Sequence, residues 1–231
     1  MLIRNRPSFI TGMLLTISFS CVLLLIFAPV FGDGRNGLQY ADDMFNRLSK
    51  GSSYFLPKIQ KHAEAMAGKS FKLELSLKSA PEAEAAAAQF AEAGLAATAT
   101  GQVVQLGGDI GKMLTVVLQD AEAGFRNDEG ALQQRYGQPA RVVLANWWKM
   151  MSRLDKSLKL EKRVPEAKAV TEVMKKGIEP AHNYFGIESE QVSNMVTEML
   201  GLLAFYVIYT VWWGYAIMKL MEGFGLVLKS H

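Results

Sequence analysis

Cysteine is almost absent from this chain of 231 residues, because Cys21 is the only one. A single cysteine excludes an intrachain disulfide, and it excludes a zinc or iron-sulfur site built from several thiolates of this chain. The Cys-x-x-Cys-His pattern of covalent haem attachment is missing for the same reason. Cys21 itself lies inside a long apolar run, where a small apolar side chain is the ordinary interpretation.

The chain also lacks a strong excess of charge of either sign. It carries 25 lysines and arginines against 22 aspartates and glutamates, which gives a formal net charge of +3. Proteins that bind nucleic acids neutralise phosphates with clustered basic side chains, and an excess this small does not suit that role. We therefore expect no nucleic-acid partner.

A recognisable catalytic pattern is lacking too. The sequence has three histidines, and none of them stands in a local pattern with a serine and an acid. The segment LGGDIGKM occupies the place of a phosphate-binding loop, but only three residues separate Gly107 from Gly111. The residue after Lys112 is Met113, where that motif needs a hydroxyl. A turn followed by a helix is the better interpretation, so we expect no enzyme activity and no cofactor.

Long apolar runs, in contrast, are present. Residues 9–31 read FITGMLLTISFSCVLLLIFAPVF, which is long enough to cross a hydrocarbon layer of about 30 Å at about 1.5 Å per helical residue. The basic residues Arg4 and Arg6 and the small Gly32 also suit a cleaved signal peptide. The apolar core of a signal peptide is usually only ~7–15 residues long, so we favour an uncleaved transmembrane helix.

Residues 199–218, MLGLLAFYVIYTVWWGYAIM, form a second uncharged run of transmembrane length. The small residues Gly201, Ala204 and Gly214 would let another helix approach closely. Aromatic side chains crowd the later part, and we expect them to contact the membrane interface, another helix or a partner subunit. These aromatic residues are Tyr206, Tyr209, Trp212, Trp213 and Tyr215.

Charges beside the two runs predict the orientation. Basic residues precede the first run and follow the second, whereas acidic residues lie on the inner flanks. By the positive-inside rule, both termini are cytoplasmic, and two spans require that they share a side. We predict a protein of a bacterial cytoplasmic (inner) membrane with residues 33–198 in the periplasm. Residues 1–8 and 219–231 would be cytoplasmic, the latter as a short amphipathic tail on the membrane surface.

Between the two runs, periodicity predicts a mostly helical domain of the α+β class. Residues 33–68 read as two amphipathic helices, which we assign to a stalk. Strict alternation in SFKLELSLKS predicts a half-buried strand. A helix after Pro81, two short strands joined near Gly101 and a helix from Asp109 follow. Together these elements predict a small β-α-β-β-α sheet unit over residues 69–126.

Residues 127–198 form a helical segment that leads to the second run. They begin with the turn-rich link NDEGALQQRYGQP, in which we expect one helical turn, and continue with a long helix and a further helix from Pro165. From about Glu188 we expect one helix that runs unbroken into the membrane. Trp147 and Trp148 are neighbours on the long helix, so their side chains point about 100° apart. One can pack in the core while the other contacts a partner, the membrane surface or a small ligand.

His182 lies shortly before the second run, where a histidine near the membrane face sometimes binds haem or relays protons. A lone histidine usually does neither. We therefore treat His182 as a weak candidate ligand and predict no metal site.

These observations favour a non-catalytic accessory or scaffold subunit of a bacterial inner-membrane protein complex. The expected partners are membrane lipids and either other integral membrane subunits or further copies of the chain. The alternative is an extracytoplasmic sensor or ligand-binding protein, because the layout resembles bacterial chemoreceptors and sensor kinases in plan. Only Lys219–His231 follow the second run, so a sensor would have to signal through a membrane partner. A membrane-bound enzyme or an assembly factor is a third, weaker option.

Overall fold

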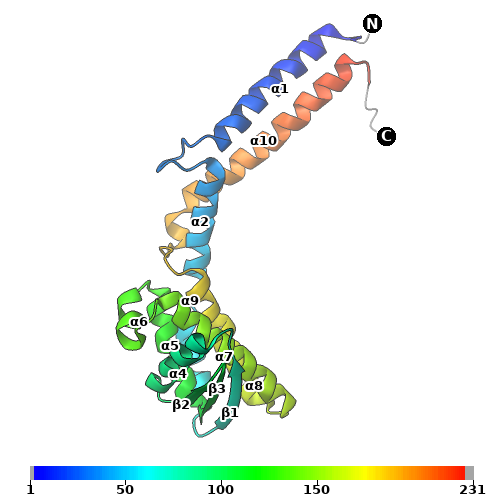
Figure 1. The fold of residues 1–231 in the computed structure, drawn as a ribbon. Helices are drawn as coiled ribbons and strands as arrows, with labels where there is room; N and C mark the ends of the chain where they lie inside the picture. Colours follow the sequence, from blue (N-terminus) through cyan, green and yellow to red (C-terminus); the bar gives the residue numbers. More distant parts are fainter. Residues whose placement is uncertain (1–2, 227–231) are drawn as a thin grey trace. The chain divides into compact units, whose positions relative to one another are not determined.

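The computed structural model describes residues 3–226 of the protein, which are mostly helical and include a three-stranded antiparallel sheet (Figure 1). The chain divides into two compact units. The first combines Met1–Leu48 with Glu190–His231, and the second is Ser49–Ser189.

Two long apolar helices dominate the first unit, α1 (Arg6–Phe27) and α10 (Val196–Gly223). By length and composition, each could span a membrane. Only 6% of the most apolar window of either helix is buried, which distinguishes both from a core helix of a soluble protein. Helix α1 ends before the predicted residue 31, because Pro29 disfavours helical backbone at Ala28, which is extended.

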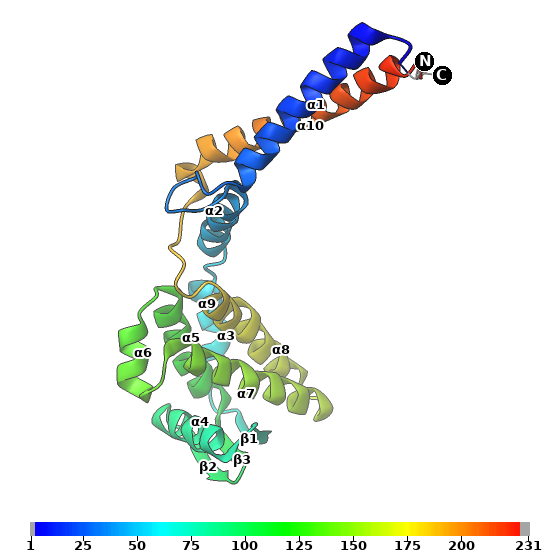
Figure 2. The ribbon, with the colours of Figure 1, turned by 45° about the horizontal axis from the view of Figure 1, so that its top comes forward.

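The helices α1 and α10 pack side by side (Figures 1 and 2). The less exposed residues at their contact recur every seven residues. Such a period keeps one face of each helix against the other in a left-handed pair. Close approach depends on two glycines, since a Cβ at Gly12 would lie 2.7 Å from the Leu220 nitrogen and one at Gly223 would lie 2.7 Å from the Phe9 Cα. The less exposed residues, which form the contact stripe, are Gly12, Phe19 and Ile26 of α1 and Leu202, Tyr209, Ala216 and Gly223 of α10.

The small residues Gly201, Ala204 and Gly214 do not face α1. A Cβ at Gly201 or Gly214 would meet no atom within 4 Å, and Ala204 is exposed. Their expected contact with another helix therefore stays a prediction. The predicted unbroken helix from Glu188 was wrong, because a short 3₁₀ helix, η2 (Val192–Asn194), precedes the start of α10.

The tail prediction is only partly covered by the structure. Residues 219–223 continue α10, whereas residues 227–231 lie outside the described residues, as do residues 1–2 at the amino terminus.

Helix α2 (Gly37–Ser52) follows α1, and the boundary between the two units falls within it. Its first turn is capped reciprocally: the Asn36 amide donates to Gln39 Oε1 at 2.9 Å, and the Gln39 amide donates to Asn36 Oδ1 at 2.9 Å. This pair of hydrogen bonds satisfies two amides that a helix start otherwise leaves without partners.

The sheet of the second unit has the order β1-β3-β2 and is antiparallel throughout. Its strands are β1 (Ser70–Ser76), β2 (Ala96–Thr100) and β3 (Val103–Asp109). Burial alternates strictly along β1, as the sequence pattern predicted. With α4 (Ala80–Glu92) and α5 (Ile110–Phe125), the strands confirm the expected β-α-β-β-α succession.

The remaining helices of this unit are α3, α6, α7, α8 and α9, and a π-helical turn, η1 (Met174–Ile178), joins the last two. The turn-rich link proves to hold a helix of eight residues, because Asp128 caps its start and Gly137, with a left-handed backbone, ends it. The bounds are α3 (Leu56–Glu64), α6 (Glu129–Tyr136), α7 (Ala140–Leu160), α8 (Val164–Val173) and α9 (Glu179–Asn183).

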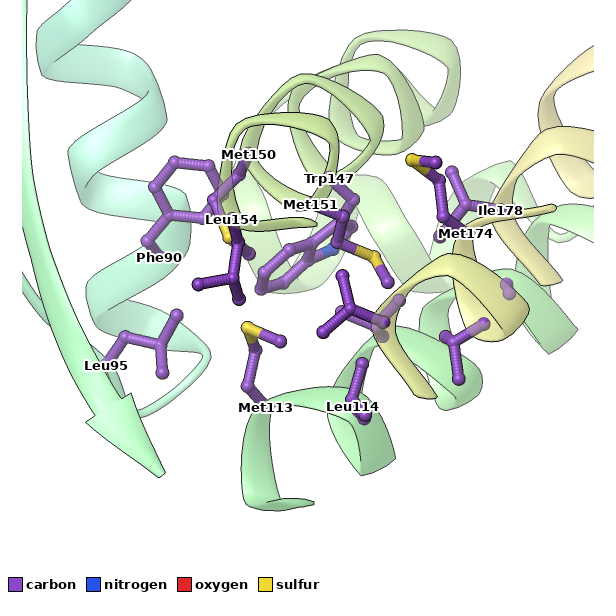
Figure 3. Packing of buried hydrophobic residues seen from close by; sticks show 14 of the residues in the cluster. Phe90, Leu95, Met113, Leu114, Trp147, Met150, Met151, Leu154, Met174 and Ile178 are labelled. Carbon is purple, nitrogen blue, oxygen red and sulfur yellow. The ribbon is translucent and has the colours of Figure 1, made fainter. Parts of the chain in front are cut away.

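One continuous hydrophobic core joins these helices to the inner face of the sheet. Figure 3 shows Trp147, Met150 and Leu154 of α7 pointing into it, toward residues of α4 and α5. Helix α3, which sequence analysis assigned to a stalk, contributes Leu56, Ile59 and Ala63 to the same core.

Candidate functional site

The five aromatic residues of α10 that were predicted as contacts have different surroundings. Tyr209, Trp212 and Trp213 pack on Phe19 of α1, with the Tyr209 ring stacked at a centroid distance of 4.1 Å. Tyr206 and Tyr215 are exposed. In the described chain, the buried Tyr209 hydroxyl and Trp212 Nε1 have no hydrogen-bond partner.

The two neighbouring tryptophans of α7 face different surroundings, as helical geometry predicted. Trp147 is fully buried and its ring lies 5.1 Å from that of Phe90. Trp148 is 45% exposed. The predicted core role fits Trp147, and only Trp148 is available for contact with a partner.

Trp147 also belongs to a buried polar network that sequence reasoning missed. Its Nε1 donates to Asp120 Oδ2 at 2.7 Å, and the Tyr136 hydroxyl donates to the same oxygen at 2.6 Å. Arg135 Nη1 lies 2.7 Å from Asp120 Oδ1. Burial raises the pKa of Asp120, while these three donors oppose the rise. Asp120 thereby ties α5 to α6 and α7, which is a structural role.

Trp148 and His182 lie together at a shallow hollow of about 320 Å³ between α7 and α9. Lys149 and Glu179 flank them, so an aromatic surface is bordered by one charge of each sign. His182 is half-buried, and its nearest polar contact is Asn183 Oδ1 at 3.4 Å from Nδ1. We call this area the Trp148 surface, formed by Ala145, Trp148, Lys149, Glu179, His182 and Asn183.

A larger hollow of about 680 Å³ lies between the outer face of the sheet and α7. Three basic side chains line it, Lys72 from β1 and Arg153 and Lys156 from α7. Among residues 3–226 none of these three forms an ion pair. We call this area the basic hollow. It escaped sequence analysis because β1 and α7 are far apart in the chain.

A buried lysine network is the third feature that the sequence did not indicate. Lys50 is 1% exposed, and its Nζ donates to Asn127 Oδ1 at 2.8 Å and to the Ile187 carbonyl at 2.6 Å. Asn127 Nδ2 donates to the same carbonyl at 3.0 Å, and the Gly186 amide donates to Asn127 Oδ1 at 2.8 Å. Burial lowers the pKa of Lys50, against an opposing effect of Glu188. This Lys50 network joins the two ends of the second unit's chain, residues 50 and 187.

His62 has an acidic partner that local spacing did not indicate. Its Nδ1 lies 2.7 Å from Glu172 Oε2 of α8. The pKa of Glu172 is lowered, first by a hydrogen bond from Lys176 and then by His62. The pair is exposed at His62 and joins α3 to α8. Within residues 3–226, no group of three or more potential ligands among His, Cys, Asp and Glu could hold a metal ion.

Comparison with known proteins does not add a relationship to this geometry. No protein-family model matches the chain, and no curated protein or solved structure gives a match.

Proposed function

We propose that the chain is a non-catalytic accessory or scaffold subunit of a bacterial inner-membrane protein complex. The observation that carries the proposal is the surface of the α1–α10 pair. Apart from the contact stripe, most of its large side chains are apolar and exposed, as at Leu24 (70%) and Ile208 (64%). A continuous apolar surface of this kind is costly in water but favourable in lipid.

The placement of the rest of the chain follows from charge. The basic residues before α1 and after α10, with the acids on the inner flanks, favour cytoplasmic termini. Residues 33–198 would then be periplasmic. The second unit would present its surface to partners that share the membrane.

The Trp148 surface is the proposed contact with another integral membrane subunit. Trp148 has an exposed ring of the type that anchors protein interfaces, and the neighbouring Lys149 and Glu179 would form a polar rim. On α10, the exposed rings of Tyr206 and Tyr215 would meet lipid or a partner helix. The small residues Gly201, Ala204 and Gly214 would allow such a helix to approach closely, because they do not face α1.

The test is purification of the tagged full chain from its native membrane in mild detergent, followed by mass spectrometry. A reproducible set of membrane proteins at stoichiometric amounts is expected. Trp148→Glu should lose one of them, whereas Val142→Glu, on the same helix at similar exposure, should keep all. Recovery of the chain alone, or only as an oligomer of itself, would sink the proposal. If both variants recover the same partner proteins, the Trp148 surface is not the contact.

One observation favours the alternative of an extracytoplasmic sensor. The basic hollow brings Lys72, Arg153 and Lys156 to one open concave area, where their charge exceeds that of the single acidic lining residue, Glu74. Such an excess of positive charge suits a small anion. Isothermal titration of the full chain with inorganic phosphate and with citrate tests this function. Saturable binding that Arg153→Gln weakens about tenfold would support the sensor. Absence of binding for both anions would eliminate this form of it.

A further inference from the structure

The free edge of β2 is the most unusual surface of the sheet. An exposed edge strand offers unpaired backbone groups to other strands, and proteins usually protect it with charged side chains, proline or a bulge. The strand β2 reads AATAT and has none of these. The opposite edge differs, since β1 carries Lys72 and Glu74. Both edge strands also pack against a helix, β1 against α7 and β2 against α4.

The hairpin geometry shows which groups of β2 point outward. Gly101 and Gln102 form a two-residue turn, with Gly101 at φ 59°, between the paired residues Thr100 and Val103. A two-residue turn makes its flanking pair a hydrogen-bonded one, and hydrogen-bonded and non-hydrogen-bonded pairs alternate along an antiparallel ladder. Thr98 and Ala96 therefore bond to β3. The amides and carbonyls of Ala97 and Ala99 point away from the sheet, and the structure records no partner for them within residues 3–226.

We infer that β2 pairs with the β2 strand of a second copy of this chain, antiparallel and centred on Thr98. In this register Ala97 lies opposite Ala99 of the partner subunit, and Ala99 opposite Ala97 of the partner subunit. Because both residues point outward, each pair exchanges two backbone hydrogen bonds, four in total. The two sheets become one six-stranded sheet.

The side chains of β2 suit this partner better than a charged or bulky one. Ala97 and Ala99 are small and half-buried, so they leave room for a second strand beside them. Thr98 meets its own counterpart on the outer face, and cross-strand threonine pairs are favourable. The stretch from Leu95 to Gln105 carries no charge, so the pairing strands themselves bring no like charges together.

Five residues per strand make a small interface. Stable interfaces bury about 1,200–2,000 Å², and a single short strand pair provides less than this, so the dimer is weak in dilute solution. The inference does not rest on the proposed membrane function, because it uses only the sheet edge. A covalent trap is the appropriate test for a weak dimer.

The experiment uses the full chain in mild detergent with Cys21→Ala as background and Thr98→Cys as the probe. In the proposed register, the two introduced thiols form a non-hydrogen-bonded pair with Cα atoms about 4.5 Å apart, which a disulfide can bridge. Thr100→Cys is the matched control, because its two copies lie about four residues apart along the strands, roughly 14 Å. On mild oxidation, Thr98→Cys should give about tenfold more covalent dimer than Thr100→Cys.

Two further changes test whether the backbone edge is responsible. Ala99→Pro, added to the Thr98→Cys chain, removes an outward amide without removing a bond to β3, and should abolish cross-linking. Ala99→Ser keeps the amide and should cross-link normally. Should the proline variant unfold, as melting would reveal, Thr98→Lys measured by light scattering replaces it, since it places like charges opposite each other. Equal cross-linking at positions 98 and 100, no covalent dimer at all, or an unaffected dimer in a folded proline variant would overturn the inference.

Discussion

Replacing Asn127 by alanine is expected to destabilise the second unit more than replacing Lys50 by methionine, although Lys50 carries the charge. Alanine removes the side-chain oxygen and the side-chain amide of Asn127. The buried Lys50 then keeps only one hydrogen bond, to the Ile187 carbonyl. The Ile187 carbonyl loses the bond from Asn127 Nδ2, and the Gly186 amide loses its acceptor, Asn127 Oδ1. Removing one partner of a buried charge costs about 3–5 kcal/mol. Asn127 also has a left-handed backbone with φ 60°, and alanine in this conformation destabilises the folded state by about 1 kcal/mol more.

Methionine at Lys50 is milder for a structural reason. In this variant Asn127 Oδ1 still accepts a hydrogen bond from the Gly186 amide, and the Ile187 carbonyl still accepts one from Asn127 Nδ2. Neither acceptor is therefore left without a donor. Two hydrogen bonds from a charged group are lost, but the cost of burying that charge disappears with them. The expected net loss is about 1–3 kcal/mol.

The assay is urea unfolding of the full chain in mild detergent, followed by circular dichroism. Asn127→Gly separates the two contributions, because glycine loses the same hydrogen bonds but accepts the positive φ without strain. The unfolding free energy of Asn127→Gly should be about 1 kcal/mol higher than that of Asn127→Ala. A Lys50→Met chain that is as unstable as Asn127→Ala, or more so, would refute the reasoning.

The same network predicts a dependence on alkaline pH. Burial lowers the pKa of Lys50, so the unfolded chain binds this proton more tightly than the folded chain. Between the folded-state pKa and the unfolded value of about 10.4, the contribution of Lys50 to the unfolding free energy therefore rises with pH. Over this pH range, the unfolding free energy of the wild type should rise relative to that of Lys50→Met.

Two other predictions concern the Asp120 network and the helix pair. Asp120→Asn replaces one acceptor oxygen by a donor and should cost about 2–4 kcal/mol in urea unfolding. Because burial raises the pKa of Asp120, the folded chain binds this proton more tightly than the unfolded chain. The resulting stabilisation of the folded state is complete below the unfolded-state pKa of about 3.9 and is lost as pH rises through the folded-state pKa. The difference from the variant should thus widen as pH falls, and a constant or shrinking difference would contradict the assignment. Gly12→Ala should weaken α1–α10 packing by about 1–3 kcal/mol in an SDS titration followed by tryptophan fluorescence. Gly201→Ala is the control, because a Cβ at Gly201 meets no neighbour and should leave the packing unchanged. The same shift in both variants would argue against the contact at Gly12.

Local periodicity was enough to predict much of the fold. The alternation of β1 follows from a period of two, and α5 follows from apolar residues three and four apart. Pro29 in the first run could have indicated the early end of α1, since the residue before a proline avoids helical backbone. The seven-residue spacing of Leu202, Tyr209 and Ala216 was likewise present in the sequence as a sign of the helix contact.

The polar networks were not predictable from local patterns. Lys50 lies 77 residues from Asn127 and 137 from Ile187. Lys50 and Asn127 look like ordinary surface residues in the sequence, and Ile187 takes part only through its backbone carbonyl. Asp120 had the same appearance on an amphipathic helix. For the candidate site, helical geometry separated Trp147 from Trp148, but the approach of His182 to Trp148 depends on how α9 packs against α7.

The most direct test of the central claim is the accessibility of single cysteines in intact cells. With Cys21→Ala as background, Lys168→Cys lies on the exposed surface of α8 and Asn5→Cys precedes α1. A membrane-impermeant maleimide, given access to the periplasm only, should label Lys168→Cys, and it should label Asn5→Cys only after the inner membrane is permeabilised. Labelling of both residues, or of neither, before permeabilisation would contradict a chain that spans the membrane twice with residues 33–198 outside the cytoplasm.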